Sequence, residues 1–275
     1  MRSIIVIYIF IYSLCVFSQQ KLPKKGVVSY GQLESLGMGG PVGIDFNSVL
    51  VFNNSRSIYI TRSDSLEKSH INENVAIESE GMGFFISKVT NAYGFRYFKD
   101  LKKDSVFSRD IGFNYVAEKI PEIEWKIQNE KKKIGSYICT KATATFRGRD
   151  FVAWFTTEIP LPFGPWKLHG LPGLILEAHD PKKEIYFYFK NIKYPSETKI
   201  GISKPVVQKE QSWKKWITFD AYKIFLIEAY INAKLSGRMI AEEVNASNLS
   251  KEVYHYNMGN TYIENFDLNG YLKKQ

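Results

Sequence analysis

The sequence is organised around the octapeptide Gly170-Leu171-Pro172-Gly173-Leu174-Ile175-Leu176-Glu177, at the centre of a longer segment from Cys139 to Asp180. Before it, Ser136–Thr145 and Phe151–Thr157 have the alternating apolar and polar pattern of β-strands. Directly after its turn residues, Leu174–Ala178 has the composition of a third strand. The segment therefore predicts three strands, with a long loop between the second and the third.

That loop, Ile159–Gly173, is fifteen residues long and contains four prolines and three glycines. Long loops inside compact domains are usually functional or disordered, and proline fixes φ, so we expect a stiff structure. Pro172 and Gly173 occupy the second and third positions of a type II turn, which predicts a positive φ at Gly173. The loop would hold three side chains at the rim of the sheet: Trp166, Lys167 and His169.

Short strand-like runs separated by turn residues recur through most of the chain. Single strands are expected at Gly26–Glu34, Ser105–Arg109 and Gly112–Glu118. Arg62–Gly83 is polar and weakly patterned, which favours a surface loop with room for a short helix. Turn signals predict four hairpins: Phe46–Phe52 with Ser57–Thr61, Phe84–Thr90 with Phe95–Phe98, Glu124–Gln128 with Ser136–Thr145, and Leu174–Ala178 with Glu184–Lys190. The pattern is typical of an antiparallel sheet in a β-rich α+β protein.

Within Ser136–Thr145, strict alternation places Ile138 and Ala142 on one face of the strand and Cys139 on the other. The second cysteine, Cys15, lies in the N-terminal apolar run, so Cys139 has no expected intrachain partner. A lone cysteine in a strand is typically a small buried hydrophobic residue.

The periodicity changes after Pro205. Apolar side chains recur at three- and four-residue steps between Thr218 and Val244, which predicts an amphipathic helix with a break near Gly237. Such a helix needs an apolar surface, so we expect a helical part, at about 206–245, that covers the sheet. Leu249–Gln275 is expected to be irregular or to form a last edge strand.

One basic residue precedes an apolar run from Ile4 to Phe17, with small residues at Val16 and Ser18. This arrangement is typical of a secretory signal peptide cut after Ser18. The sequence therefore predicts removal of residues 1–18 and a single exported domain over 19–275. No later run approaches the roughly 20 apolar residues of a membrane span, so no transmembrane segment is expected in the mature chain.

The net charge of +9 is unevenly distributed, since Lys182–Lys215 contains nine lysines and three glutamates. This region is either a solvated surface or a site that attracts an acidic partner, such as lipid head groups or anionic glycans. The region has no recognised nucleic-acid-binding motif and the chain is expected to be exported, which argues against a nucleic-acid partner.

No nucleophile elbow, two-histidine helix motif or paired-carboxylate signature occurs, so no catalytic residue or cofactor is assigned. Glu177 and His179 share one face of a predicted strand, and His169 could fold over them. Two histidines and a glutamate can ligate zinc, which leaves a metal-dependent hydrolase as an alternative. A nucleophile pair of Cys139 with either histidine depends on a proximity that the sequence cannot show.

The aromatic and basic residues around the loop have two interpretations. In a structural one, the aromatic rings plug one end of the sheet and the arginines pair with Glu158, Glu177 or Asp180. In a functional one, the same side chains grip a ligand or a partner chain. The binding residues predicted by the functional interpretation are Arg147, Arg149, Trp154, Trp166, His169, Leu171 and Pro172.

Six runs in order carry a family resemblance: Tyr137–Ala142, Phe146–Arg149, Ala153–Thr156, Ile159-Pro160, Gly164–Lys167 and Gly170–Glu177. Together they resemble the GLPGLI family of exported Bacteroidota proteins. The resemblance implies a Gram-negative setting, in the periplasm or at the outer membrane. It also implies a strongly curved, half-barrel-like antiparallel sheet with a C-terminal covering helix, similar to periplasmic lipoprotein carriers.

The resemblance supplies no activity and no catalytic residues, and it associates such proteins with outer-membrane receptors and transport systems. We therefore expect a non-enzymatic binding or accessory protein of the cell envelope. Its expected partners are an outer-membrane protein, a peptide or a lipid.

Overall fold

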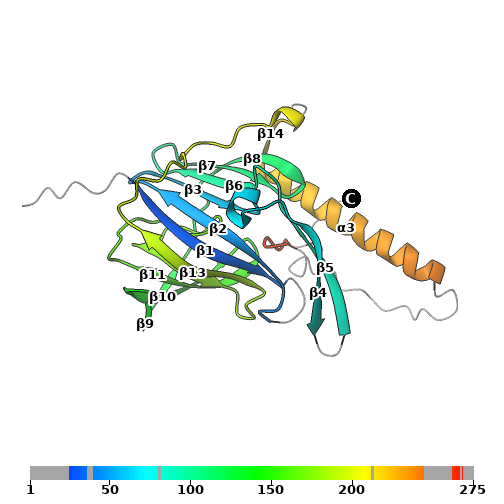
Figure 1. Cartoon of the computed structure of the whole chain (residues 1–275), viewed down its shortest axis with the longest axis horizontal. Coiled ribbons are helices and arrows are strands. Elements are labelled where there is room, and N and C mark those ends of the chain that lie inside the picture. Colours follow the sequence, from blue (N-terminus) through cyan, green and yellow to red (C-terminus); the bar gives the residue numbers. More distant parts are fainter. Residues whose placement is uncertain are drawn as a thin grey trace, which may run out of the picture.

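The computed structural model describes residues 25–35, 40–79, 82–211, 214–244, 262–266 and 268. The predicted signal peptide at 1–18 and most of the segment after Leu249 lie outside these residues. In the described part, twelve strands form one large sheet, and two further strands form a separate ribbon (Figure 1). The protein is therefore mostly β, as the sequence predicts.

The large sheet has β14 and β9 at its two edges and is not closed into a barrel. All neighbouring strands are antiparallel except β14 and β8, which makes the sheet mixed. From one edge to the other, the strands are β14 (Trp216–Thr218), β8 (Asn114–Lys119), β7 (Ser105–Asp110), β6 (Phe95–Asp100), β3 (Arg56–Thr61), β2 (Ile44–Phe52), β1 (Gly26–Glu34), β13 (Ile185–Lys193), β12 (Leu174–His179), β11 (Arg149–Thr156), β10 (Tyr137–Phe146) and β9 (Lys126–Ile134).

The two halves of the sheet meet through a long-range pairing. β1 pairs with β13 from Val27↔Lys193 to Glu34↔Ile185. The predicted hairpins β2–β3 and β12–β13 are confirmed on either side of this junction. The N-terminal strand is therefore separated by β13 alone from β12, the strand that follows the central loop.

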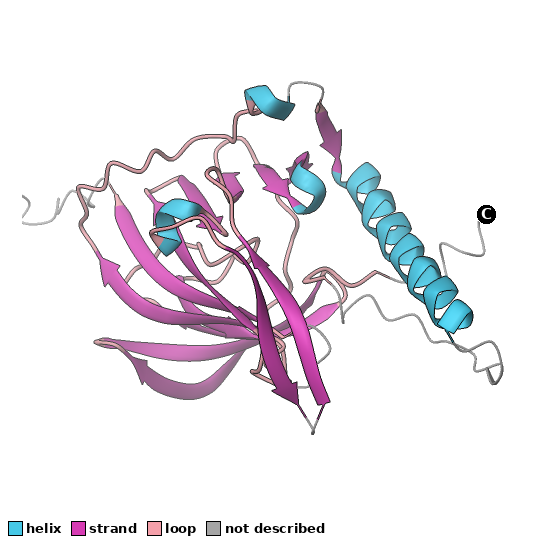
Figure 2. Cartoon of the chain, turned by 45° about the vertical axis from the view of Figure 1, so that its right-hand side comes forward, coloured by secondary structure: helices cyan, strands magenta, loops and turns pink. Residues whose placement is uncertain are grey.

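The prediction of a surface loop at Arg62–Gly83 is wrong, except for the short helix that it allowed. The segment contains α2 (Asp64–Glu67) and β4 (Asn72–Ser79), and β4 pairs with β5 (Met82–Val89) in a ribbon that projects from the large sheet (Figures 1 and 2). The predicted hairpin of Phe84–Thr90 with Phe95–Phe98 is also wrong, because β6 pairs with β3 and β7. At 72–76 and 87–89, the part of the ribbon whose side chains are described, no side chain is buried, and without a buried face the first strand lacks the alternation that identifies a strand.

β9 and β10 pair as predicted, but the connection lies at Gly135, with φ of 58°, and not at 129–133. The lysines of that segment belong to an exposed edge strand, where charged side chains discourage pairing with other chains. The face assignment in β10 is also corrected. A register shift after Thr140 leaves Cys139 and Ala142 both fully buried and Ile138 52% exposed.

The predicted helix is confirmed as α3 (Phe219–Val244), and it continues through Gly237 without a break. Its first half packs Tyr222 and Leu226 against Val116 of β8 and Leu268. The second half extends beyond the sheet (Figure 1). The helix therefore covers one end of the sheet and not its whole face, because its sheet contacts are concentrated on the edge strand β14 and its neighbour β8.

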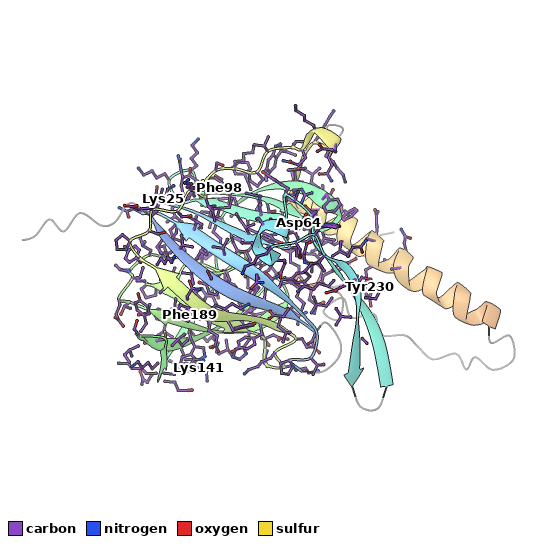
Figure 3. The ribbon with its side chains drawn as sticks, viewed as in Figure 1. Lys25, Asp64, Phe98, Lys141, Phe189 and Tyr230 are labelled. Atoms are coloured by element: carbon purple, nitrogen blue, oxygen red, sulfur yellow. The ribbon has the colours of Figure 1, made fainter. Side chains whose placement is uncertain are left out.

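The main core lies between the sheet and the loop Ile159–Gly173, which contributes Phe163, Trp166, Leu168 and Leu171 to it. In Figure 3, Lys25 lies at one end of the sheet and Tyr230 lies at the other end, on α3. Within the described chain, no helix has the length and apolar character needed to cross a membrane.

Candidate functional site

The central loop is a buried structure that is tethered to the sheet. Trp166 and Lys167 are each 1% exposed and His169 is 6% exposed. Lys99 Nζ, from β6, donates to the carbonyl oxygens of Trp166 at 2.8 Å and Leu168 at 3.1 Å. Burial, and then the charge of Lys167, lower the pKa of Lys99 to about 7. Near neutral pH, Lys99 is therefore a hydrogen-bond donor to the loop that holds only part of a charge.

The backbone of the loop differs from the predicted type II turn. Positive φ values occur at Trp166, where φ is 51°, and at Gly170, where it is 92°, and not at Gly173. A glycine is needed at 173 for another reason: the backbone of Thr156 lies so close that a Cβ at this position would be 2.1 Å from its carbonyl oxygen. The two glycines of the hexapeptide therefore serve different purposes.

A buried ionic group, which we call the Lys167 cluster, joins the loop to distant segments: Asp110, Glu118, Arg147, Lys167 and Glu264. Lys167 Nζ lies 2.8 Å from Glu264 Oε1, 3.3 Å from Glu118 Oε1 and 3.9 Å from Asp110 Oδ2. Arg147 pairs with Glu118, and its guanidinium lies 3.4 Å from the centre of the Phe219 ring of α3. The cluster contains three carboxylates and two cations.

The carboxylates decide the charge states in the cluster. Burial lowers the pKa of Lys167, but Glu264, Glu118 and Asp110 outweigh it, so the pKa is raised. Burial raises the pKa of Glu264, with Asp110 acting in the same direction and Lys167 opposing it. Lys167 is therefore charged, and Glu264 holds its proton more readily than an exposed glutamate does.

A cavity of about 200 Å³ adjoins the cluster. Its walls come from β1, β6, the loop, α3 and the segment 262–264. Three carboxylates, Glu34, Asp110 and Glu264, line it together with the rings of Tyr97, Trp166 and Tyr222. Arg62 also lines it, paired with Glu34 at 2.6 Å. The cavity therefore combines aromatic surface with a few convergent charged groups, as ligand sites do.

Two buried polar atoms belong to this cavity: Arg62 Nε, which has no hydrogen-bond partner among the described residues, and the Tyr222 hydroxyl, which interacts with the Asp110 carboxylate. Tyr222 is fully buried, and burial, followed by the charges of Asp110 and Glu264, raises its pKa well above the usual value. A hydroxyl that donates to a carboxylate still has an oxygen that can accept a hydrogen bond from an occupant of the cavity.

The predicted binding residues are divided between the two faces of the sheet. Trp166 lines the cavity. Trp154 alternates with the buried Ala153 and Phe155, and it packs against Lys132 on the other face, 4.4 Å from the ring centre. His169 and Leu171 are buried in the loop, and Pro172 is exposed.

The two arginines anchor the last described segment. Arg149 Nη1 pairs with Asp180 at 2.9 Å, as one of the sequence alternatives has it. Its other nitrogens donate to the carbonyl oxygens of Tyr262 and Ile263, each at 3.1 Å. Arg147 pairs with Glu118, which was not among the partners predicted from the sequence. Both arginines therefore position the wall of the cavity.

The structure does not bring the three alternative metal ligands together. Glu177 pairs with Lys132 at 2.7 Å, and His179 packs edge-on against Tyr186. His169 lies in the loop, where burial lowers its pKa to about 4. Within the described residues, no group of three His, Cys, Asp or Glu side chains is arranged to hold a metal ion.

Cys139 is a free, fully buried thiol, as predicted. Burial raises its pKa to about 12, so the nucleophilic thiolate is scarce at neutral pH.

Sequence reasoning missed most of the cavity. Tyr97, Asp110 and Glu34 lie in or directly after ordinary strands, and Glu264 lies in a segment expected to be irregular. Two lining residues had a signal: Trp166 from the loop rich in proline and glycine, and Tyr222 from the apolar period of the predicted helix. A local pattern contains no information about which buried polar residues will meet across the fold.

Two crystal forms of a protein described as PNGF-II resemble this chain weakly, with 14% and 13% identity and TM-scores of 0.45 and 0.44. Each comparison covers 73% of this chain and 32% of that one, so the chain spans about a third of that protein's length. No curated protein matches the sequence. A family model described as "Protein of unknown function (Porph_ging)" matches residues 147–177, the segment that runs from Arg147 through the central loop to Glu177.

Proposed function

We propose that this chain is an exported, GLPGLI-type binding protein of the cell envelope that holds a small ligand in the cavity beside Trp166. The signal-like N-terminus supports export, to the periplasm or the outer membrane. The family match over the central loop agrees with the GLPGLI resemblance. In this proposal the sheet is a half-barrel whose open end is narrowed by α3.

The observation that carries the proposal is the cavity itself, about 200 Å³ with Asp110 and Tyr222 in its wall. A water occupies about 30 Å³ in the liquid, so the volume corresponds to roughly seven waters. This is enough for one small molecule, the side chain of a peptide or a lipid head group. A donor on the ligand would bond to the oxygen of the Tyr222 hydroxyl.

A blocked cavity tests the proposal. Ile111 lines the cavity and is half-buried, so Ile111→Trp should fill part of the space. Ile138→Trp makes the same change on the outer part of β10, where Ile138 is 52% exposed. Each purified protein is incubated with the small-molecule fraction of an envelope extract, and gel filtration removes unbound compounds before mass spectrometry.

We expect one compound to stay with the wild type and Ile138→Trp and to be lost from Ile111→Trp. The proposal fails if no compound is retained, or if all three proteins retain the same one equally. Thermal unfolding of each variant checks that Ile111→Trp is folded, because overpacking typically costs about 1–3 kcal/mol.

A further inference from the structure

The charge of the cavity wall limits what it can bind. Three carboxylates line the cavity, at Glu34, Asp110 and Glu264, and Arg62 is the one cation that lines it among the described residues. Directly behind the wall lie Lys167 and Arg147, with Glu118 between them. The whole group therefore has four carboxylates and three cations when all are ionised.

One further cation lies nearby. Lys99 interacts with Lys167 and Glu118, but its amine donates to the two loop carbonyls. Its pKa of about 7 means that it supplies only part of a charge near neutral pH. The charged groups that line the cavity itself are three carboxylates and one cation, so its wall presents more negative than positive charge, which favours a positively charged occupant.

The aromatic rings favour the same occupant. Tyr97, Trp166 and Tyr222 line the cavity, and ring faces attract cations. The protein already uses this chemistry next to the cavity. Lys167 Nζ lies 5.8 Å from the ring centre of Trp166 and 5.6 Å from that of Tyr222, while its charge is paired with Glu264.

Arg62 repeats the arrangement on the other side. Its guanidinium lies 4.7 Å from the ring centre of Phe46 and 5.1 Å from that of Phe95, and it pairs with Glu34. Two cations of the chain itself are therefore held between carboxylates and aromatic rings at this cavity. The hydroxyl of Tyr222 interacts with Asp110, and its oxygen can also accept a hydrogen bond from an ammonium group.

We infer that the ligand of this cavity is a small organic cation with an alkylammonium group, bound between Asp110, Glu264 and the ring and hydroxyl of Tyr222. The inference rests on the proposed function, since it names the chemical class of the ligand for the same site. Electrostatics agrees, because negative charge from Asp110 and Glu264 contributes to the raised pKa of Tyr222.

Three probes of equal chain length test the charge preference: 1,4-diaminobutane, 1,4-butanediol and succinate. Each is titrated into the purified mature protein by isothermal calorimetry at low salt. We expect 1,4-diaminobutane to bind and the diol and the dianion to bind at least about 10-fold more weakly, since a charge-assisted hydrogen bond is worth about that factor or more.

Two variants place the binding in the cavity. Asp110→Asn keeps the oxygen that accepts from Tyr97 at 2.9 Å and from the Ile111 amide at 2.8 Å, so the variant should fold. Tyr222→Phe removes only the hydroxyl. We expect each variant to weaken diamine binding about 10-fold. The matched control is Glu130→Gln, which removes a carboxylate on β9 that pairs with Lys141, and it should leave binding unchanged.

The outcomes separate this inference from the proposed function. Tighter binding of the diol or of succinate would leave the cavity a ligand site and overturn its cation preference. No binding of any probe would also overturn the inference, while retention of a native compound that Ile111→Trp loses would still support the proposed function. If Asp110→Asn and Tyr222→Phe bind the diamine as tightly as the wild type does, the cation binds elsewhere and the inference is overturned.

Discussion

Lys167 Nζ lies 2.8 Å from Glu264 Oε1, so the central loop is ion-paired to a residue 97 positions later in the chain. Both side chains are buried, at 1% and 4% exposure. Each is costly to leave alone, because an unpaired buried charge loses its hydration without compensation. This pair therefore connects the loop, the cavity wall and the last described segment.

Removal of the cation from this pair should be strongly destabilising. Lys167→Met leaves Glu264, Glu118 and Asp110 with one fewer cation, and breaking such a buried pair typically costs about 3–5 kcal/mol. The loss should be smaller at pH 5 than at pH 8, because protonation neutralises the carboxylates left behind. Urea denaturation at the two pH values measures it, and an equal loss at both would contradict the assignment.

The two loop glycines should respond differently to alanine. Gly173→Ala places a Cβ 2.1 Å from a backbone oxygen and should be severely destabilising, by more than about 3 kcal/mol. Gly170→Ala places a Cβ in ordinary contact with the Trp125 ring, at 3.9 Å, and should cost about 1 kcal/mol, from its positive φ alone. Chemical denaturation of both variants measures the difference. The reverse order would support a type II turn with positive φ at Gly173.

Lys99 should make stability depend on pH. An unfolded lysine keeps its proton up to about pH 10.4, whereas Lys99 in the folded protein has a pKa of about 7. Between these values the unfolded state binds more protons, so the free energy of unfolding should rise with pH, by up to about 1.4 kcal/mol per unit.

The measurement is the free energy of unfolding between pH 7 and 8.5, below the range where unfolded tyrosines ionise and where the thiol of Cys139, whose pKa is raised in the folded state, would oppose the rise. Lys99→Met should abolish the rise, and it should also destabilise the protein at pH 8.5 by leaving two loop carbonyls without a donor. Lys141→Met is the control, since Lys141 pairs with an exposed glutamate on β9. If the free energy of unfolding of Lys99→Met still rises with pH, the rise comes from another group.

Cation binding should tighten as pH rises from 5 to 7. The pKa of Glu264 is raised in the free protein, so at low pH part of this carboxylate is protonated. An ammonium ligand must then displace the proton, which lowers the affinity by at most about tenfold for each unit by which the pH falls. The amine itself stays charged throughout this range. Calorimetry with 1,4-diaminobutane at both pH values checks it. Affinity that falls towards pH 7 would show that Glu264 is not part of the site.

The elements that could be predicted are those whose signal is local. The hairpin β12–β13 surrounds Asp180–Lys183, and α3 shows its period over Thr218–Val244, so both were recognised. The pairing of β1 with β13 has no local signal, because any exposed strand edge could accept β1. The register shift after Thr140 was invisible too, since a bulge moves side chains between faces without changing composition.

The site was harder to predict than the fold. The sequence singled out the loop because prolines and glycines at that density are unusual, and Trp166 of this loop lines the cavity. It could not show that Lys167 would be buried among Asp110, Glu118 and Glu264, which come from three separate parts of the chain. A charged side chain that is buried and paired looks in sequence like an exposed one.

The most direct measurement is an experimental structure of the mature protein purified from its native envelope without added ligand. We predict non-protein density in the cavity, in contact with the Tyr222 hydroxyl and bounded by Trp166 and Glu264. A cavity that holds only ordered water, with a native compound bound at another surface, would contradict the account.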